Sequence, residues 1–262
     1  MVPPRKYYVF RAATSVSELK SLLQLRYRGY LESKCASLMH ENLHGLDLDG
    51  YDMQARHFGL FECNGRTERP IGYIRFAQDT VSPQLKEIWQ LSMGYPDLVN
   101  QLEYNPNAPY PVLGHLEDSG PVNDFYKNIC SEGKSMVEGS RMVLDSAYRS
   151  LGFSRFIIEA AVSVCLYSFA YDFSVLACVP NHRRFYERFG FTNLHTSVYD
   201  DVKCHIMLIT QNQLSNQLRN NFEQMAEAFS RFNALYYYPK VAGQYTPMPI
   251  PQPILDRTPV VA

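Results

Sequence analysis

The chain lacks several features that would place a protein in a class at once. Its first residues, MVPPRKYYVFRAA, contain no apolar core of the kind that a signal peptide needs. The apolar run over residues 156–171 is shorter than the roughly 20 residues of a membrane-spanning helix, and it contains Glu159. The formal net charge of −1 gives no reason to expect nucleic acid as a partner. We therefore expect a soluble cytoplasmic protein with no transmembrane segment.

Cysteine is dispersed and repeats are missing. The six cysteines show no metal-ligand spacing and lie partly in apolar runs, which predicts buried thiols in a reducing compartment and no metal site. No internal repeat is visible. What is present is an apolar content of 46% over 262 residues, enough for one substantial α/β core.

The stretch 136–191 has the clearest secondary-structure pattern. It predicts a strand over 136–144, a helix from 153 to about 171, and a strand over 173–179. Asn181 then opens a short helix as a capping residue would, and a glycine ends that helix.

The loop before the longer helix reads R-x-x-G-F-S, with Arg149, Gly152 and Ser154 in that order. A glycine admits close approach of the backbone, a helix N-terminus offers unpaired N–H groups, and the arginine adds a positive charge. The pattern favours a phosphate site. The alternative is an ordinary turn into a helix.

At this spacing, the loop and the Asn181 segment resemble the GCN5-related N-acetyltransferase (GNAT) superfamily. The resemblance implies an α/β fold with a mixed, mostly antiparallel sheet flanked by helices. It also implies that the two central strands splay apart and that the pantetheine arm of an acyl thioester lies between them.

The same resemblance implies roles for particular residues. Tyr186 would protonate the departing thiolate, although a core aromatic packed on the sheet is an equal interpretation. The donor and the tetrahedral oxyanion would be bound by Met142, Val143, Leu144, Arg149, Gly152, Ser154 and Asn181.

An arginine lies on the apolar stripe of a helix predicted to begin at Ser15. If Arg26 points into the core it needs a partner or a ligand, because an unpaired buried charge is costly. The alternative is a side chain that snorkels to solvent. Arg26 followed four residues later by Tyr30 resembles a local pattern of the acyl-homoserine-lactone synthases.

A D-x-x-D segment, Asp49 and Asp52, precedes a strand predicted from His57. Two carboxylates so close can receive an ammonium group or share protons, whereas the alternative is an exposed acidic turn. In the acyl-homoserine-lactone synthases such a segment serves the acceptor side. The resemblance also implies that Arg75, on the next predicted strand, joins the polar network of the site; an outward-facing arginine is the alternative.

The E-x-S-R sequence formed by Glu138 and Arg141 is distinctive of acyl-homoserine-lactone synthases and of the related N-acyl amino acid synthases. The resemblance implies that both residues lie beside the thioester and that Glu138, with His57, accepts the amine proton. On a regular strand, side chains three apart face opposite sides unless a bulge intervenes. A structural ion pair of these residues with Arg26 or Asp52 is the alternative.

We expect residues 1–210 to form one acyltransferase domain. Within it, the proline-rich segment 78–135 predicts an insertion of loops with short helical patches, which could wall an acyl-chain pocket. A polar turn is expected after 191. An amphipathic helix is expected over 211–238, and a proline-rich, disordered tail over 239–262.

One departure bears on the acceptor. The acyl-homoserine-lactone synthases carry a tryptophan after the first helix, whereas the only tryptophan here is Trp89. This argues against S-adenosylmethionine. We expect an N-acyltransferase that moves a long-chain fatty acyl group from acyl carrier protein to the amine of an amino acid, with the acceptor bound by Arg26, Asp49, Asp52 and Arg75.

The expected co-substrate is an acyl thioester, acyl carrier protein or acyl-CoA, with no tightly bound cofactor. Three alternatives stay open. The chain would make an acyl-homoserine-lactone-type autoinducer, act as an acetyl-CoA-dependent N-acetyltransferase, or bind acyl groups or CoA without catalysis.

Overall fold

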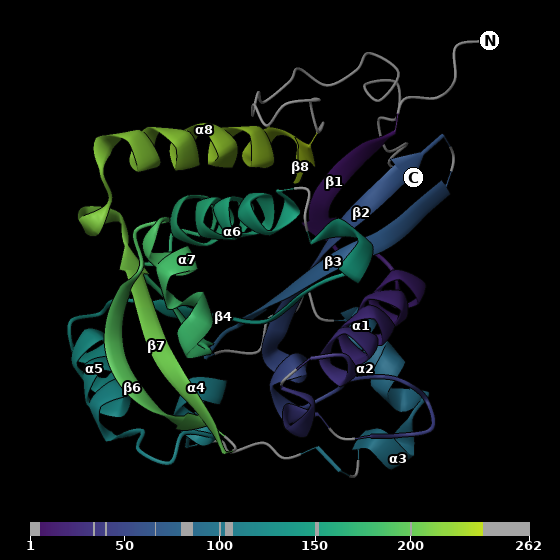
Figure 1. Cartoon of the computed structure of the whole chain (residues 1–262), viewed down its shortest axis with the longest axis horizontal. Coiled ribbons are helices and arrows are strands. Elements are labelled where there is room, and N and C mark those ends of the chain that lie inside the picture. The colour runs from purple at the N-terminus through teal and green to yellow at the C-terminus, as the bar shows by residue number, and fades with distance from the viewer. Residues whose placement is uncertain are drawn as a thin grey trace.

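The computed structural model describes residues 6–33, 35–39, 41–65, 67–79, 86–99, 101–102, 107–149, 152–199 and 201–237. One eight-stranded sheet runs through them in the order β6-β7-β5-β4-β3-β2-β1-β8 (Figure 1). The strands are β1 (Tyr7–Ala12), β2 (Ala55–Asn64), β3 (Thr67–Ala77), β4 (Met136–Leu144), β5 (Phe173–Cys178), β6 (Thr192–Tyr199), β7 (Val202–Thr210) and β8 (Ala234–Tyr237).

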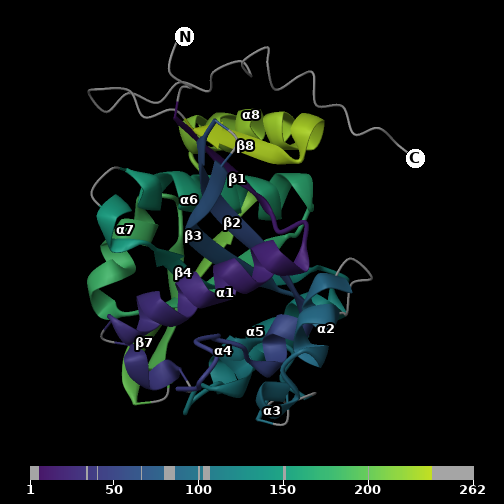
Figure 2. The same cartoon turned by 90° about the vertical axis from the view of Figure 1, so that its right-hand side faces the viewer.

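Helices cover both faces of this sheet. The α-helices are α1 (Val16–Leu31), α2 (Lys86–Met93), α3 (Pro96–Val99), α4 (Pro111–Gly114), α5 (Gly120–Ser131), α6 (Phe153–Ser163), α7 (Arg183–Glu187) and α8 (Asn216–Phe232). Helices α6 and α8 lie side by side on one face (Figures 1 and 2). Helices α1 and α2 pack on the other face of the N-terminal strands, and α4 and α5 pack on the C-terminal strands.

The centre of the sheet is split. β4 and β5 form a parallel pair, but they pair only from Met136 to Glu138 on β4, opposite Phe173 to Val175. All the other neighbouring strands are antiparallel. The structure thus confirms the expected mixed, mostly antiparallel sheet, flanked by helices, with two central strands that separate.

Capping and apolar spacing explain the first helix. Ser15 Oγ accepts a hydrogen bond from the Glu18 backbone N–H at 3.2 Å, which satisfies one of the unpaired donors at the start of α1. Leu19, Leu22 and Leu23 follow on the buried stripe. Arg26 lies on the same stripe and has no exposed surface.

The 78–135 insertion holds the short helices α2 to α5, and Pro111 and Pro121 lie in the first turns of α4 and α5, where the missing N–H costs nothing. Two other expected elements are corrected. The polar segment after 191 is strand β6, paired with β7. The expected helix over 211–238 is shorter: Asn233 ends α8 with φ 51°, and β8 then pairs with β1.

The tail over 239–262 lies outside the described residues. Among the described helices, none combines the length and apolarity needed to cross a bilayer.

Candidate active site

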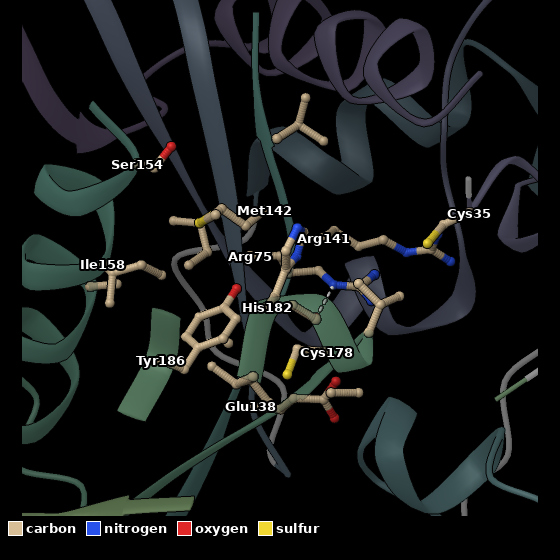
Figure 3. A pocket seen from close by; sticks show the side chains of 18 of the residues that line it. Cys35, Arg75, Glu138, Arg141, Met142, Ser154, Ile158, Cys178, His182 and Tyr186 are labelled. Carbon is tan, nitrogen blue, oxygen red and sulfur yellow. Dashed lines mark hydrogen bonds between the residues drawn. The ribbon is translucent and has the colours of Figure 1, made fainter. Parts of the chain in front are cut away.

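A cavity of about 450 Å³ opens where β4 and β5 separate (Figure 3). It reaches both faces of the sheet. Ser140 pairs with Arg75 and so shares the face that α1 covers, whereas Met142 packs with the core under α6. Residues from α6, among them Ile158 and Ala161, complete an apolar wall. None of the described residues of the 78–135 insertion lines this cavity.

A bulge in β4 shapes the polar side of the cavity. The register with β3 shifts between the pairs Tyr73↔Val143 and Arg75↔Ser140, so two β4 residues oppose one on β3. Arg141 is the residue with positive φ, 57°, a conformation that non-glycine residues rarely adopt. Glu138 and Arg141 both line the cavity although they are three positions apart, as do the β4 residues between them.

The β4 edge that faces β5 is the expected place for the acyl carbonyl. β4 pairs with β5 only through Glu138, so the strand beyond that residue keeps β3 as its partner on one side only. Met142, Val143 and Leu144 line the cavity along this edge. Backbone N–H groups aimed at such a gap can hold a developing oxyanion.

Two of the three predicted R-x-x-G-x-S residues, Arg149 and Ser154, line the α6 end of the cavity, and Gly152 does not. Gly152 is the residue before α6 and has φ 77°, a left-handed conformation that suits glycine. Arg149 and Ser154 line the cavity, and Arg149 Nε donates to the Leu144 carbonyl at 3.2 Å. A phosphate at this end would meet a helix N-terminus and a guanidinium.

Tyr186 is a buried tyrosine that also lines the cavity. In Figure 3 its hydroxyl points toward Met142. Burial raises its pKa, which keeps the hydroxyl protonated and able to donate. The expectation that Asn181 contacts the donor is corrected, because Asn181 is exposed and does not line the cavity. The residue that precedes α7 and lines the cavity is His182.

Glu138 is almost completely buried and lies at the polar side of the cavity (Figure 3). Burial raises its pKa to about 8, although the backbone N–H of Val112 donates to its Oε2 at 2.9 Å and favours the charged form. A carboxyl group with a pKa near the working pH can both accept and release a proton.

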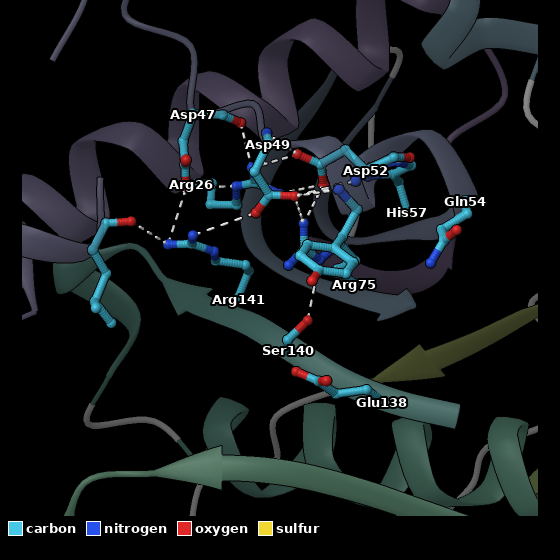
Figure 4. Close-up of polar contacts among 12 residues, drawn as sticks. Arg26, Asp47, Asp49, Asp52, Gln54, His57, Arg75, Glu138, Ser140 and Arg141 are labelled. Atoms are coloured by element: carbon cyan, nitrogen blue, oxygen red, sulfur yellow. Dashed lines mark hydrogen bonds and ion pairs between the residues drawn. The ribbon is translucent and has the colours of Figure 1, made fainter. Parts of the chain in front are cut away.

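Three arginines and three aspartates form a buried network beside Glu138, shown in Figure 4. Asp52 receives Arg26 Nη1 and Nη2 at 2.8 Å each and Arg75 Nη1 at 2.9 Å. Burial alone would raise the pKa of Asp52, but the charges of Arg26 and Arg75 hold it well below its usual range. The remaining contacts are Arg26 Nε to Asp47 Oδ2 at 2.7 Å, Arg75 Nη1 to Asp49 Oδ1 at 2.5 Å, Arg75 Nε to Ser140 Oγ at 3.1 Å, and Arg141 Nη2 to Asp49 Oδ2 at 3.3 Å.

The contacts of this network exclude two alternatives that the sequence left open. Arg26 does not snorkel, because it is fully buried and paired. The D-x-x-D segment is no exposed turn, since Asp49 caps a short 3₁₀ helix and Asp52 is fully buried. Arg75 and Arg141 are the members that line the cavity, whereas Arg26 and Asp52 lie behind it, with Asp52 paired to both Arg26 and Arg75.

His57 lies away from the cavity. It is on β2, and β3 separates it from β4. Its Nδ1 contacts Tyr73 Oη at 2.8 Å and its Nε2 contacts the Asp52 carbonyl at 3.1 Å, and burial lowers its pKa to about 4. Both ring nitrogens therefore have partners within the network, and His57 is not among the residues that line the cavity, whereas Glu138 is.

Sequence reasoning missed several members of the site. Asp47 precedes the D-x-x-D segment by two positions, so an extended D-x-D-x-x-D pattern would have found it. Ser140 is the serine of E-x-S-R and was available from the same motif. Tyr199 and His182 line the cavity but belong to no recognisable pattern.

Comparisons with known proteins agree with this geometry. Residues 112–212 match the family model of the N-acyl amino acid synthase FeeM, and that segment holds Glu138, Arg141 and Tyr186. Among curated proteins no sequence matches the chain significantly.

Two solved structures have the same fold. The FeeM N-acyl amino acid synthase from uncultured soil microbes superposes with a TM-score of 0.50 at 16% identity, covering 80% of this chain and 94% of that one. The CoA-dependent acyl-homoserine lactone synthase BjaI gives a TM-score of 0.50 at 14% identity, covering 84% and 90%. The expected GNAT-like fold, and the resemblance to this branch, are thus confirmed.

Proposed function

We propose that the chain, which has this fold and matches the FeeM family model over residues 112–212, is an N-acyltransferase that transfers a fatty acyl group from acyl carrier protein to the amine of an amino acid. The observation that carries the proposal is the cavity through the split sheet. It joins an apolar wall under α6 to a polar end with Glu138, Arg75 and Arg141.

The apolar wall suits a fatty chain. Ile158, Ala161 and Val162 of α6 and Leu176 of β5 face the cavity, and no charged group of α6 does. Burying each CH₂ group of an acyl chain there would contribute about 0.8 kcal/mol. A cavity of about 450 Å³ has room for more than an acetyl group and its thioester.

The polar end supports an amino acid as acceptor. Arg141 stacks over the Tyr30 ring at 5.1 Å and is held by the Leu38 carbonyl at 2.9 Å, so its guanidinium is fixed. Asp49 keeps 16% of its side chain exposed, more than Asp47 or Asp52. The carboxylate of an amino acid would match Arg141, which lines the cavity, while Asp49 lies behind it as the ion-pair partner of Arg141.

In the proposed reaction one bond is exchanged for another, and the ammonium of the amino acid first loses a proton to solvent. As the resulting amine attacks the thioester carbon, Glu138 accepts the second proton that the nitrogen loses, directly or through a water, and later releases it to solvent. Backbone N–H groups of Met142 to Leu144 stabilise the oxyanion. When the C–S bond breaks, Tyr186 donates its proton to the thiolate and regains one from solvent. The products are an amide and a free thiol.

Basic residues at the α6 and α7 end support a carrier protein as donor. Arg149 lines the cavity, and Arg155 and Arg183 are exposed nearby, with 61% and 43% of their side chains accessible. Such a surface suits an acidic carrier protein, although it also suits the phosphates of CoA.

The test is an in vitro panel. Purified protein is incubated with acyl carrier protein or CoA thioesters of several chain lengths and with a mixture of amino acids, and products are identified by mass spectrometry. An N-acyl amino acid formed from acyl carrier protein supports the proposal. If products form from CoA thioesters but not from acyl carrier protein, the donor is acyl-CoA and not the proposed carrier protein. If a lactone forms from S-adenosylmethionine, the acceptor is S-adenosylmethionine and not an amino acid.

A further inference from the structure

A five-residue segment of the insertion, Ala108–Val112, runs behind Glu138. We call it the strap. Tyr110 and Val112 have no exposed surface, so the strap is part of the core. Four hydrogen bonds fix it to the body: Tyr51 Oη to the Ala108 carbonyl at 3.1 Å, Gln54 Nε2 to the Pro109 carbonyl at 2.5 Å, Tyr110 Oη to the Met136 carbonyl at 2.7 Å, and the Val112 N–H to Glu138 Oε2 at 2.9 Å.

The strap has little freedom to move. Pro111 follows Tyr110 and restricts φ at the start of α4. Just beyond it, Gly114 lies so close to Tyr51 that a Cβ there would be 2.1 Å from the tyrosine hydroxyl. Tyr51 and Gln54 belong to the short 3₁₀ helix that also carries Asp49 and Asp52. The strap therefore joins the acceptor-side network to β4.

The bond at the end of the strap bears directly on Glu138. Among the described residues, the Val112 N–H is the one hydrogen-bond donor to the Glu138 carboxylate. It contacts Oε2, which leaves Oε1 available to the cavity that Glu138 lines. An amide N–H is a permanent donor and cannot change its protonation, so it favours the carboxylate form at every pH.

We propose that the Val112 main-chain amide is a positioning group for Glu138: the strap holds it where it orients the carboxylate and stabilises the charged form that accepts the amine proton. The inference rests on the proposed function for the role of Glu138. It makes the insertion a structural part of the acid–base machinery.

The test removes only the N–H. Val112 is replaced by its α-hydroxy acid through nonsense suppression, so that the Pro111–Val112 amide becomes an ester with the same side chain. A hydrogen bond to a charged group is worth enough to move a pKa by about one to two units. We expect the pKa that defines the rising limb of the kcat/KM pH profile to shift to higher pH by about one to two units. Activity at pH 7 then falls about 10- to 100-fold and recovers at high pH.

Val122 provides the matched control. It is also fully buried and follows a proline in the first turn of an insertion helix, α5. The same ester at Val122 should leave the pH profile unchanged. Proline also lacks the backbone N–H, so the variants Val112→Pro and Val122→Pro repeat the same comparison with a standard amino acid. In a Glu138→Gln background, the ester at Val112 should have no further effect on rate.

A second readout does not depend on turnover. The Glu138 carboxyl is titrated by infrared difference spectroscopy and assigned with Glu138→Gln. The ester at Val112 should raise the midpoint, and an unchanged midpoint, or a loss of rate that is equal at every pH, would overturn the inference. If the native protein has no acyltransferase activity, the proposed function fails while this titration still decides whether Val112 controls Glu138.

Discussion

Asp52 binds Arg26 with both carboxylate oxygens, at 2.8 Å each, although neither side chain has any exposed surface. The same aspartate also holds Arg75, which lines the cavity. Its main contribution is therefore to keep two arginines neutralised and fixed behind the acceptor side.

Replacing Asp52 by asparagine should destabilise the fold strongly. The substitution leaves Arg26 buried with one of its two carboxylate partners, Asp47, and breaking a buried ion pair typically costs about 3–5 kcal/mol. Urea unfolding followed by circular dichroism measures the difference. The control is Asp97→Asn, because Asp97 pairs with His44 at the surface, where such a pair is worth about 0–1 kcal/mol. Equal effects of the two substitutions would contradict a central role for Asp52.

The same pair predicts the response to acid. Because the folded pKa of Asp52 is held below the usual value of 3.8, its contribution to stability is present above that pH and is lost as the pH falls through the folded pKa. The melting temperature of the native protein should drop below about pH 4. Asp52→Asn should show a smaller drop over the same range.

Glu138→Gln should abolish proton acceptance while keeping the volume of the side chain. We expect kcat to fall about 10²- to 10⁴-fold at pH 7, the usual range for a general base. Because the native carboxyl has a pKa of about 8, native kcat/KM should rise with pH until about that value, and the variant should not show this limb. Glu132→Gln, at an exposed surface ion pair, is the control and should leave the rate unchanged.

Tyr186→Phe tests protonation of the thiolate. The rate should fall about 10²-fold or more with KM little changed, because the hydroxyl acts when the C–S bond breaks. A thioester of a more acidic thiol should recover part of the loss, since that thiolate leaves without a proton. Tyr167→Phe removes another buried hydroxyl, one with no hydrogen-bond partner and outside the cavity lining, and should not change the rate. An unchanged rate in Tyr186→Phe would return this residue to a core packing role.

Ala161→Leu tests the apolar wall. The larger side chain would fill space under α6 that a long chain needs, and excluding two CH₂ groups costs about 1.6 kcal/mol, or roughly 15-fold in rate. Short-chain donors should be affected far less. Ala228→Leu on α8 lies outside the cavity lining and serves as the control. Equal losses for all chain lengths would place the acyl chain elsewhere.

Much of the site could be read from local patterns. The position of Arg26 on an apolar stripe predicted a buried charge that needs partners. Asp52 of the D-x-x-D segment is one of these partners. The sequence did not show that both carboxylate oxygens of Asp52 would pair with arginines. The orientation of the Asp52 side chain is set by the 3₁₀ helix that Asp49 caps. Likewise, alternation along a strand predicts opposite faces for Glu138 and Arg141, and neither the bulge at Arg141 nor a cavity that reaches both faces of the sheet can be read from the sequence.

The parts that failed depend on contacts far apart in the chain. Strand β8 has four residues and exists because it pairs with β1, whose residues lie 223 to 229 positions earlier in the chain. The strap is hidden in a proline-rich segment, and its role follows from where Val112 meets Glu138, 26 positions later. Neither pairing leaves a periodic signal.

The central claim is amide synthesis at the split between β4 and β5. The most direct measurement is mass spectrometry of lipid extracts from cells that express the native protein or Glu138→Gln at matched levels. We predict an N-acyl amino acid that appears with the native protein and is strongly reduced in the variant, with a mass that gives the chain length and the acceptor. An identical product from both proteins, or no acylated amine from either, would contradict the account.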